Sequence, residues 1–214
     1  NLGLAVGPDF DYVLIEENNF HYILLASRLE AVFSHKKDEK PSYKILKTLK
    51  GNELEGLLYE PIFPYFSHLK ANEDGKAEDG SIGAFRVMCG SFVTTEDGTG
   101  VVHMAPGFGE DDNALCKSYE LPTVCPVDAE CKFTKEVPEY EGVFVKTADK
   151  EIIERLKSEG KLFKRDTILH SYPHCWRCSS PLIYRAVESW FVKVTNIKET
   201  MLQVNEDIHW QPAH

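Results

Sequence analysis

The stretch that decides the fold is GTGVVHMAPGFGEDD, residues 98–112. Gly98 and Gly100 favour a tight turn, and the two valines that follow favour a short strand that reaches His103. A Pro-Gly corner ends this strand, and three acids then open a predicted helix, EDDNALCKSYEL. Carboxylates are favourable there because the first turn of a helix has free N–H groups. A strand end followed by a helix start is a place where polar side chains can converge on a ligand.

His103, Asp111 and Asp112 are the candidate catalytic residues of this stretch. By spacing alone, a histidine after two valines is more often a partly buried strand residue, and acids at a helix start are more often caps. The chain has no G-x-S-x-G, Walker or H-E-x-x-H motif. Chemistry at this corner would therefore use a positioned water rather than a covalent intermediate.

The composition limits the classes of function. The 214 residues carry a net charge of −10, from 24 Lys and Arg against 34 Asp and Glu. A protein that binds nucleic acid by itself is usually basic, so this chain alone should hold RNA or DNA poorly. No apolar run approaches the roughly 20 residues of a membrane helix. Six scattered cysteines favour a reduced compartment, and we expect a cytoplasmic protein.

Many short predicted strands with interspersed short helices indicate an α+β fold. Residues 1–33 predict strands and a helix, SYKILKTLKG a short amphipathic stretch, and GLLYEPIFPYF a strand broken by prolines. DKEIIERLKSEG predicts an amphipathic helix and KLFKRDTILHSYP a last strand, while residues 34–42 and 67–81 predict polar loops. This order favours a closed or strongly curved β-structure decorated by helices, and not βαβ repeats. A change to aromatic, cysteine-containing and basic sequence near residue 166 predicts a boundary there.

A second cluster lies in this last region. Cys175 and Cys178 have the C-x-x-C spacing that lets two thiolates bind one metal ion, but a structural Zn²⁺ takes four ligands. The chain has no second C-x-x-C, although His170 and His174 could substitute. A thioredoxin-like redox motif would need a surrounding βαβ pattern, which is missing. Two free cysteines in a turn are as well supported as a zinc half-site.

Three stretches, taken together, resemble one family. GTGVVHMAPGFGEDD, HSYPHCWRCSSPLIYRA and SWFVKVTNIKETM, in this order, resemble the isoleucyl-tRNA synthetases of the cytosolic eukaryotic type. The resemblance spans essentially all 214 residues and corresponds to the editing insertion, the first connective polypeptide. It implies an editing β-barrel over residues 1–165 and, over 166–214, a C-x-x-C strand region with a linker toward the catalytic domain. Valyl- and leucyl-tRNA synthetases are the alternatives, but their counterparts of residues 98–112 usually read GTG followed by a P-A-H-D run.

The resemblance implies a hydrolytic function. One methylene changes binding in an apolar pocket by only about 1–3 kcal/mol, a limit for which isoleucyl-tRNA synthetase is itself the standard worked example. A second site that hydrolyses Val-tRNA(Ile), and also valyl-adenylate, supplies the missing fidelity. The implied partners are the misacylated 3′ end of tRNA(Ile) and the rest of the synthetase, with no membrane. No cofactor is implied in this stretch; zinc belongs to the full-length enzyme, and ATP and Mg²⁺ to its catalytic domain.

The resemblance also assigns roles residue by residue. It implies that Asp112 binds the α-ammonium group of the substrate and that His103 excludes isoleucine by its bulk, general-base action being the weaker alternative. Asp111 caps the helix or exchanges roles with Asp112, and Gly100 allows a close backbone approach to the substrate. Asn1 lies near the pocket, at the end of a threonine-rich segment.

The resemblance further implies that the threonine-rich segment and a second cysteine pair lie upstream of Asn1. The chain is then an excised fragment that folds but deacylates poorly, and Cys175 and Cys178 form at most half of a zinc site. The competing hypothesis is a non-catalytic zinc-ribbon or interaction module whose acids only cap a helix.

Overall fold

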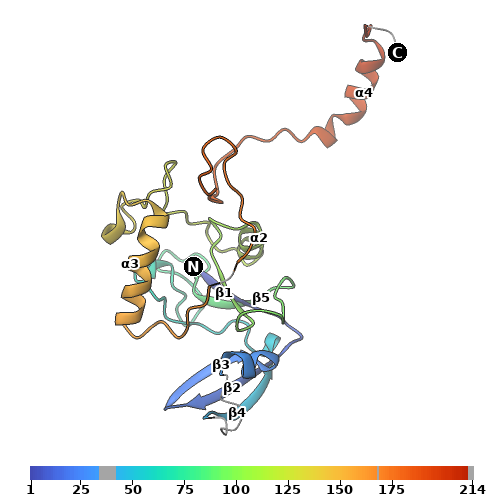
Figure 1. Cartoon of the computed structure of the whole chain (residues 1–214). Coiled ribbons are helices and arrows are strands. Elements are labelled where there is room, and N and C mark those ends of the chain that lie inside the picture. Colours follow the sequence, from blue (N-terminus) through green and yellow to red (C-terminus); the bar gives the residue numbers. More distant parts are fainter. Residues whose placement is uncertain (34–41, 168, 212–214) are drawn as a thin grey trace.

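The computed structural model describes residues 1–33, 42–167 and 169–211. Within these residues the strands form two three-stranded sheets, and helices flank them (Figure 1). Across the same residues, every helix is too short or too polar to cross a membrane. The predicted loop 34–42 falls almost entirely outside the described residues.

The first sheet carries the candidate site. Its central strand β1 (Gly3–Val6) pairs in parallel with β5 (Arg86–Cys89) and antiparallel with β6 (Val101–Met104). Both ladders are formed by four-residue strands, and the register places Leu4 opposite His103. Because β1 has neighbours on both sides, it is buried along most of its length.

The second sheet is a separate antiparallel lobe. Its central strand β2 (Asp11–Glu17) pairs with β3 (Phe20–Leu25) and β4 (Lys44–Lys50), and a bulge interrupts the β2–β4 register between Leu14 and Ile15. The β2–β3 hairpin turns through Asn18 and Asn19, which have φ of 50° and 66°. Asparagine tolerates this left-handed conformation, as two-residue hairpin turns require.

Four α-helices complete the described chain, together with short 3-10 turns. The helices are α1 (Leu29–Val32), α2 (Glu110–Ser118), α3 (Val145–Ser158) and α4 (Lys198–Glu206). The 3-10 turns are η1 (Ala26–Arg28), η2 (Gly51–Glu53), η3 (Ser67–Leu69), η4 (Pro138–Tyr140) and η5 (Val194–Asn196). The predicted helices at 110–121 and 149–160 therefore exist, with α3 starting four residues earlier than its predicted segment.

The largest core cluster lies between the first sheet and α2. Met88, Met104 and Cys116 are completely buried in it, and Phe85 and Leu2 are nearly so. Tyr12 links the two sheets, because its hydroxyl accepts a hydrogen bond from the Gly7 N–H (2.9 Å) and donates one to the Gly100 carbonyl (2.7 Å). This core holds the end of β6 and the start of α2 in a fixed relation.

The α+β fold class is confirmed, but the strands do not close into a barrel in the described residues. The stretch 57–65 contributes only an isolated bridge between Leu58 and Arg86 at the edge of β5. Pro61 and Pro64 follow, and proline cannot donate to a strand ladder. The sheet therefore stops at β5. The predicted amphipathic stretch SYKILKTLKG is strand β4, and residues 161–173 form no strand where they are described.

The C-terminal segment extends away from the body and ends in α4 (Figure 1). No residue after Ala148 belongs to the buried core of the described chain. Phe163 is the last aromatic residue that packs on the second sheet lobe, with ring centroids 5.3 Å from Tyr22 and 5.2 Å from Phe33. A boundary near residue 166 agrees with this arrangement and stays a prediction.

Candidate functional site

The corner between β6 and α2 is held by the side chain of Asp112. Gly109 is the N-cap of α2 with extended backbone, which makes Asp112 the third residue of the helix. Asp112 Oδ1 accepts a 2.6 Å hydrogen bond from the Ala105 N–H, across the Pro-Gly corner. A Cβ on Gly109 would lie 2.3 Å from Asp112 Oδ2, so only glycine leaves room for the carboxylate in this position.

Asn1 lies beside the end of β6. The Leu2 N–H donates a 2.9 Å hydrogen bond to the Met104 carbonyl, which continues the β1–β6 ladder toward the start of the chain. Asp112 also interacts electrostatically with His103. The structure therefore brings together three of the residues that the sequence predicts at the site: Asn1, His103 and Asp112.

An apolar cavity of about 410 Å³ opens beside Asn1 and His103. This volume falls within the range of about 300–1,000 Å³ that is typical of small-molecule pockets. Its other walls come from three segments, and these contribute the following residues: Pro61, Ile62, Phe63, Tyr65 and Phe66; Pro126, Phe133, Val137 and Tyr140; Ile152 and Leu156. Phe85 completes the lining. Asn1 and His103 are thus polar groups at the edge of an otherwise mostly apolar space.

The pKa of the His103 imidazole lies below its ordinary 6.5. Partial desolvation of the ring at the edge of the cavity lowers this pKa and favours the neutral form, although the side chain keeps contact with solvent, and the carboxylate of Asp112 opposes the shift. Desolvation disfavours the charged form of a base. A neutral ring suits contact with an apolar side chain.

Two of the predicted site residues lie apart from this group. Asp111 is exposed on the first turn of α2. Gly100 immediately precedes β6 and has φ of +74°, and a Cβ there would lie 2.5 Å from Leu25 Cβ. Its carbonyl accepts the hydrogen bond from Tyr12. The glycine therefore shapes the turn and its packing against β3, and the structure does not bring it to the cavity.

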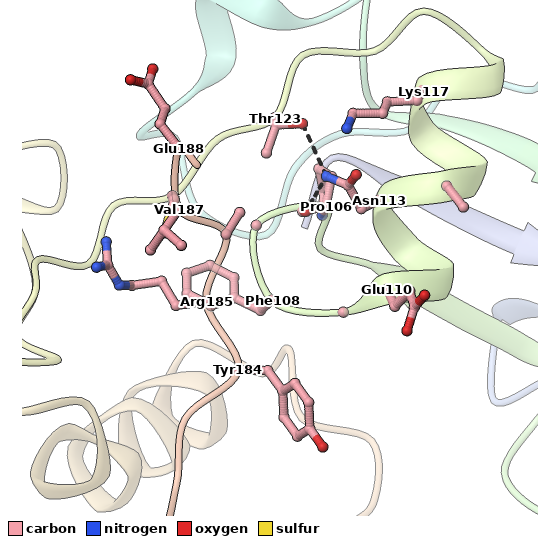
Figure 2. A pocket seen from close by; sticks show the side chains of 15 residues that line it. Pro106, Phe108, Glu110, Asn113, Lys117, Thr123, Tyr184, Arg185, Val187 and Glu188 are labelled. Carbon is pink, nitrogen blue, oxygen red and sulfur yellow. Dashed lines mark hydrogen bonds between the residues drawn. The ribbon is translucent and has the colours of Figure 1, made fainter. Parts of the chain in front are cut away.

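A second cavity, of about 850 Å³, lies on the other side of the same corner. Figure 2 shows residues 184–188, which we call the strap, facing α2 across the loop of Pro106 and Phe108. The Ala186 N–H donates a 2.7 Å hydrogen bond to the Gly107 carbonyl and ties the strap to this loop. Asn113 Nδ2 donates to the Pro106 carbonyl (2.8 Å) and to Thr123 Oγ1 (3.2 Å) (Figure 2). Asn113 thus connects the first turn of α2 to the loop of Pro106 and to the segment of Thr123.

Cys175 and Cys178 lie in a tight turn. The Cys175 N–H donates to the Ser180 carbonyl and the Ser179 N–H to the Cys175 carbonyl, both at 2.8 Å. Hydrogen bonds from Ser180 and from the thiol of Cys175 lower the pKa of Cys178. The turn therefore carries both thiols of the C-x-x-C spacing, which supplies two of the four ligands that a structural Zn²⁺ takes. Within residues 1–33, 42–167 and 169–211, no group of three or more His, Cys, Asp or Glu side chains is placed to hold a metal.

The sequence predicted none of the residues in the far wall of the first cavity. The helix of Ile152 and Leu156 is recognisable from its apolar spacing, but spacing does not say which segments pack against that face. The prolines at 61 and 64 indicate only an interrupted strand. The convergence of these segments is a tertiary property.

The comparisons with known proteins agree on one family. Residues 22–214 match the model of the tRNA synthetases class I (I, L, M and V). The whole chain is 66% identical to the isoleucine–tRNA ligase of Treponema denticola and 50% identical to that of Treponema pallidum, covering 20% and 19% of those proteins. It is 46% identical to the isoleucine–tRNA ligase of Rickettsia canadensis, covering 18% of it. The chain thus spans about a fifth of the length of these relatives.

A solved structure shows the same fold. The crystal structure of GlLeuRS-CP1 matches with a TM-score of 0.52 and 12% sequence identity, covering 81% of this chain and 79% of that one. This likeness concerns the fold alone, and the predicted fold type is confirmed at this level. The three relatives named above are bacterial, and the cytosolic eukaryotic subtype stays a prediction.

Proposed function

The chain belongs to the class I tRNA synthetases of the isoleucine, leucine, methionine and valine group, and from this we propose that it is the editing region of an isoleucine–tRNA ligase. In this proposal it hydrolyses the ester of Val-tRNA(Ile), and also valyl-adenylate, by water attack. The 66% identity to an isoleucine–tRNA ligase over the full chain favours isoleucine over the valine and leucine enzymes. A purely structural zinc module would not need an acid and a histidine beside a cavity.

The observation that carries the proposal is the position of Asp112. Its Oδ1 is occupied by the Ala105 N–H, and its carboxylate lies at the end of β6, where His103 and Asn1 border the apolar cavity. A carboxylate can bind the α-ammonium group of an aminoacyl ester while the side chain of the amino acid enters apolar space. The ring of His103, at the edge of this space, then limits the size of that side chain.

The remaining parts of the protein supply the other functions in this proposal. With a net charge of −10, the chain leaves the body of tRNA(Ile) to other domains and receives only the misacylated 3′ end. ATP and Mg²⁺ act in the catalytic domain of a cytoplasmic enzyme. Cys175 and Cys178 would contribute two thiolates to a structural Zn²⁺ whose other ligands come from elsewhere in the protein.

The test is Asp112→Asn in the full-length synthetase. Asparagine keeps the shape and an acceptor for the Ala105 N–H, but it loses the charge. A hydrogen bond to a charged group contributes about 1.5–3 kcal/mol, so kcat/KM for hydrolysis of Val-tRNA(Ile) should fall by about 10- to 150-fold.

Glu110→Gln is the matched control, because it neutralises an exposed acid in the same helical turn. Asp111→Asn tests whether the two aspartates exchange roles. Hydrolysis at the wild-type rate in Asp112→Asn would refute the proposal.

A further inference from the structure

The two sides of the 410 Å³ cavity differ in the size of the buried hydrophobic cluster that supports each of them. His103 and Phe85 belong to the side formed by the first sheet, where the adjoining core cluster contains nine buried residues. The opposite side rests on a cluster with three buried residues, Val137, Tyr140 and Ala148. A site that separates valine from isoleucine must keep both sides in place, because a flexible wall would yield to one extra methylene.

Arg155 of α3 connects the segments of this weaker side. Its Nη1 donates a 2.9 Å hydrogen bond to the hydroxyl of Tyr65, and its guanidinium carbon lies 5.0 Å from the centroid of the Phe63 ring. The rings of Phe63 and Tyr65 are stacked, with centroids 5.7 Å apart. One side chain on α3 thereby holds two of the three aromatic residues of the 61–66 segment that line the cavity.

The same guanidinium reaches the third segment of the wall. It lies 3.7 Å from Glu139 Oε1 and also interacts with the hydroxyl of Tyr140, in the 3-10 turn η4. Its Nε donates a 2.8 Å hydrogen bond to Glu159, one helical turn further along α3, and this bond fixes the rotamer. The planar, multi-donor guanidinium can make these contacts at once, which a lysine ammonium cannot.

We propose that Arg155 is a positioning residue that holds the aromatic wall of the cavity against α3 and so determines which side chain the deacylation site accepts. The inference rests on the proposed function. Arg155 does not itself line the cavity. It acts through Phe63, Tyr65 and Tyr140, which do. Discrimination by one methylene in an apolar pocket corresponds to about 10- to 200-fold, which is small enough to be lost when one wall relaxes.

The experiment compares single-turnover deacylation of Val-tRNA(Ile) and Ile-tRNA(Ile) by full-length synthetase without ATP or free amino acid. Arg155→Ala should raise hydrolysis of Ile-tRNA(Ile) relative to Val-tRNA(Ile) by about tenfold, within the range set by one methylene. Arg155→Lys should be intermediate. Tyr65→Phe, which removes only the hydroxyl that receives the hydrogen bond, should shift the ratio in the same direction.

Lys157→Ala is the matched control, because this lysine is exposed on the same helix; it should keep the wild-type ratio. An unchanged ratio in both Arg155→Ala and Tyr65→Phe would overturn the inference, as would an equal loss of both activities that follows a loss of thermal stability. Failure of the wild-type enzyme to hydrolyse Val-tRNA(Ile) would instead refute the proposed function, and the inference with it.

Discussion

His103→Ala distinguishes between two roles for this histidine in the proposed deacylation: exclusion of isoleucine by its bulk, and action as a general base. The ring lines the cavity beside Asn1, and partial desolvation there lowers the pKa of His103 and favours its neutral form. If the ring acts by bulk, its removal enlarges the space that receives the side chain of the amino acid. Isoleucine, which is one methylene larger than valine, then gains access to the site. If the ring acts as a general base, its removal slows hydrolysis of every ester.

The magnitude follows from the size of the difference between the two substrates. One methylene in an apolar pocket is worth about 1–3 kcal/mol, or about 10- to 200-fold in rate. His103→Ala should therefore raise hydrolysis of Ile-tRNA(Ile) by up to this factor and leave hydrolysis of Val-tRNA(Ile) within a few-fold of wild type. Loss of a general base would instead cost about 10²- to 10⁴-fold for both substrates.

The assay is single-turnover deacylation of both tRNAs by the full-length enzyme. Val102→Ala is the matched control, because successive side chains of a strand point to opposite faces and Val102 is 39% exposed. An equal fall of both rates in His103→Ala would refute the steric role. So would a variant that continues to reject isoleucine.

The pH dependence of stability gives a second measurement on the same residue. The pKa of His103 is lowered in the folded state, so the unfolded chain takes up the proton first as the pH falls through about 6.5. Wild type should therefore lose stability relative to His103→Gln between pH 7 and pH 5, and the two should keep a constant difference above pH 7.5. A constant difference across the whole range would contradict the lowered pKa of His103 in the folded state.

Two further predictions concern the rest of the fold. Tyr12→Phe leaves the buried Gly7 N–H and Gly100 carbonyl without their partner. At about 1–3 kcal/mol for each of the two unsatisfied groups, the free energy of urea unfolding should fall by about 2–6 kcal/mol. Tyr22→Phe is the control, and a loss as small as that of the control would refute the hydrogen bonds. In alkylation of the folded, metal-free protein followed by mass spectrometry, the exposed Cys178, whose pKa is lowered, should react first. Cys116, buried with its pKa raised to about 11, should react last; early labelling of Cys116 would contradict its place in the core.

How far the site could be predicted differs from residue to residue. Asp112 and His103 stand out in the sequence because a strand, a Pro-Gly corner and an acidic helix start follow one another within fifteen residues. That local order forces the end of the strand and the start of the helix to lie close together. Gly100 belongs to the same stretch, but Leu25 packs against it and Tyr12 donates a hydrogen bond to its carbonyl. These contacts give Gly100 a structural role in the turn before β6, away from the cavity.

The sequence by itself determined the family, the α+β class, the helices near 110 and 150, and the placing of His103 and Asp112 at one corner of the fold. All of these follow from local order or from motifs read along the chain. Tertiary structure alone decided that the sheets stay open, because the pairing of strand edges depends on distant segments that two prolines interrupt. It also decided that Phe63, Tyr140 and Leu156 meet in one cavity wall held by Arg155. Apolar periodicity shows that a face is buried, but the residues that cover it are chosen only when the whole chain packs.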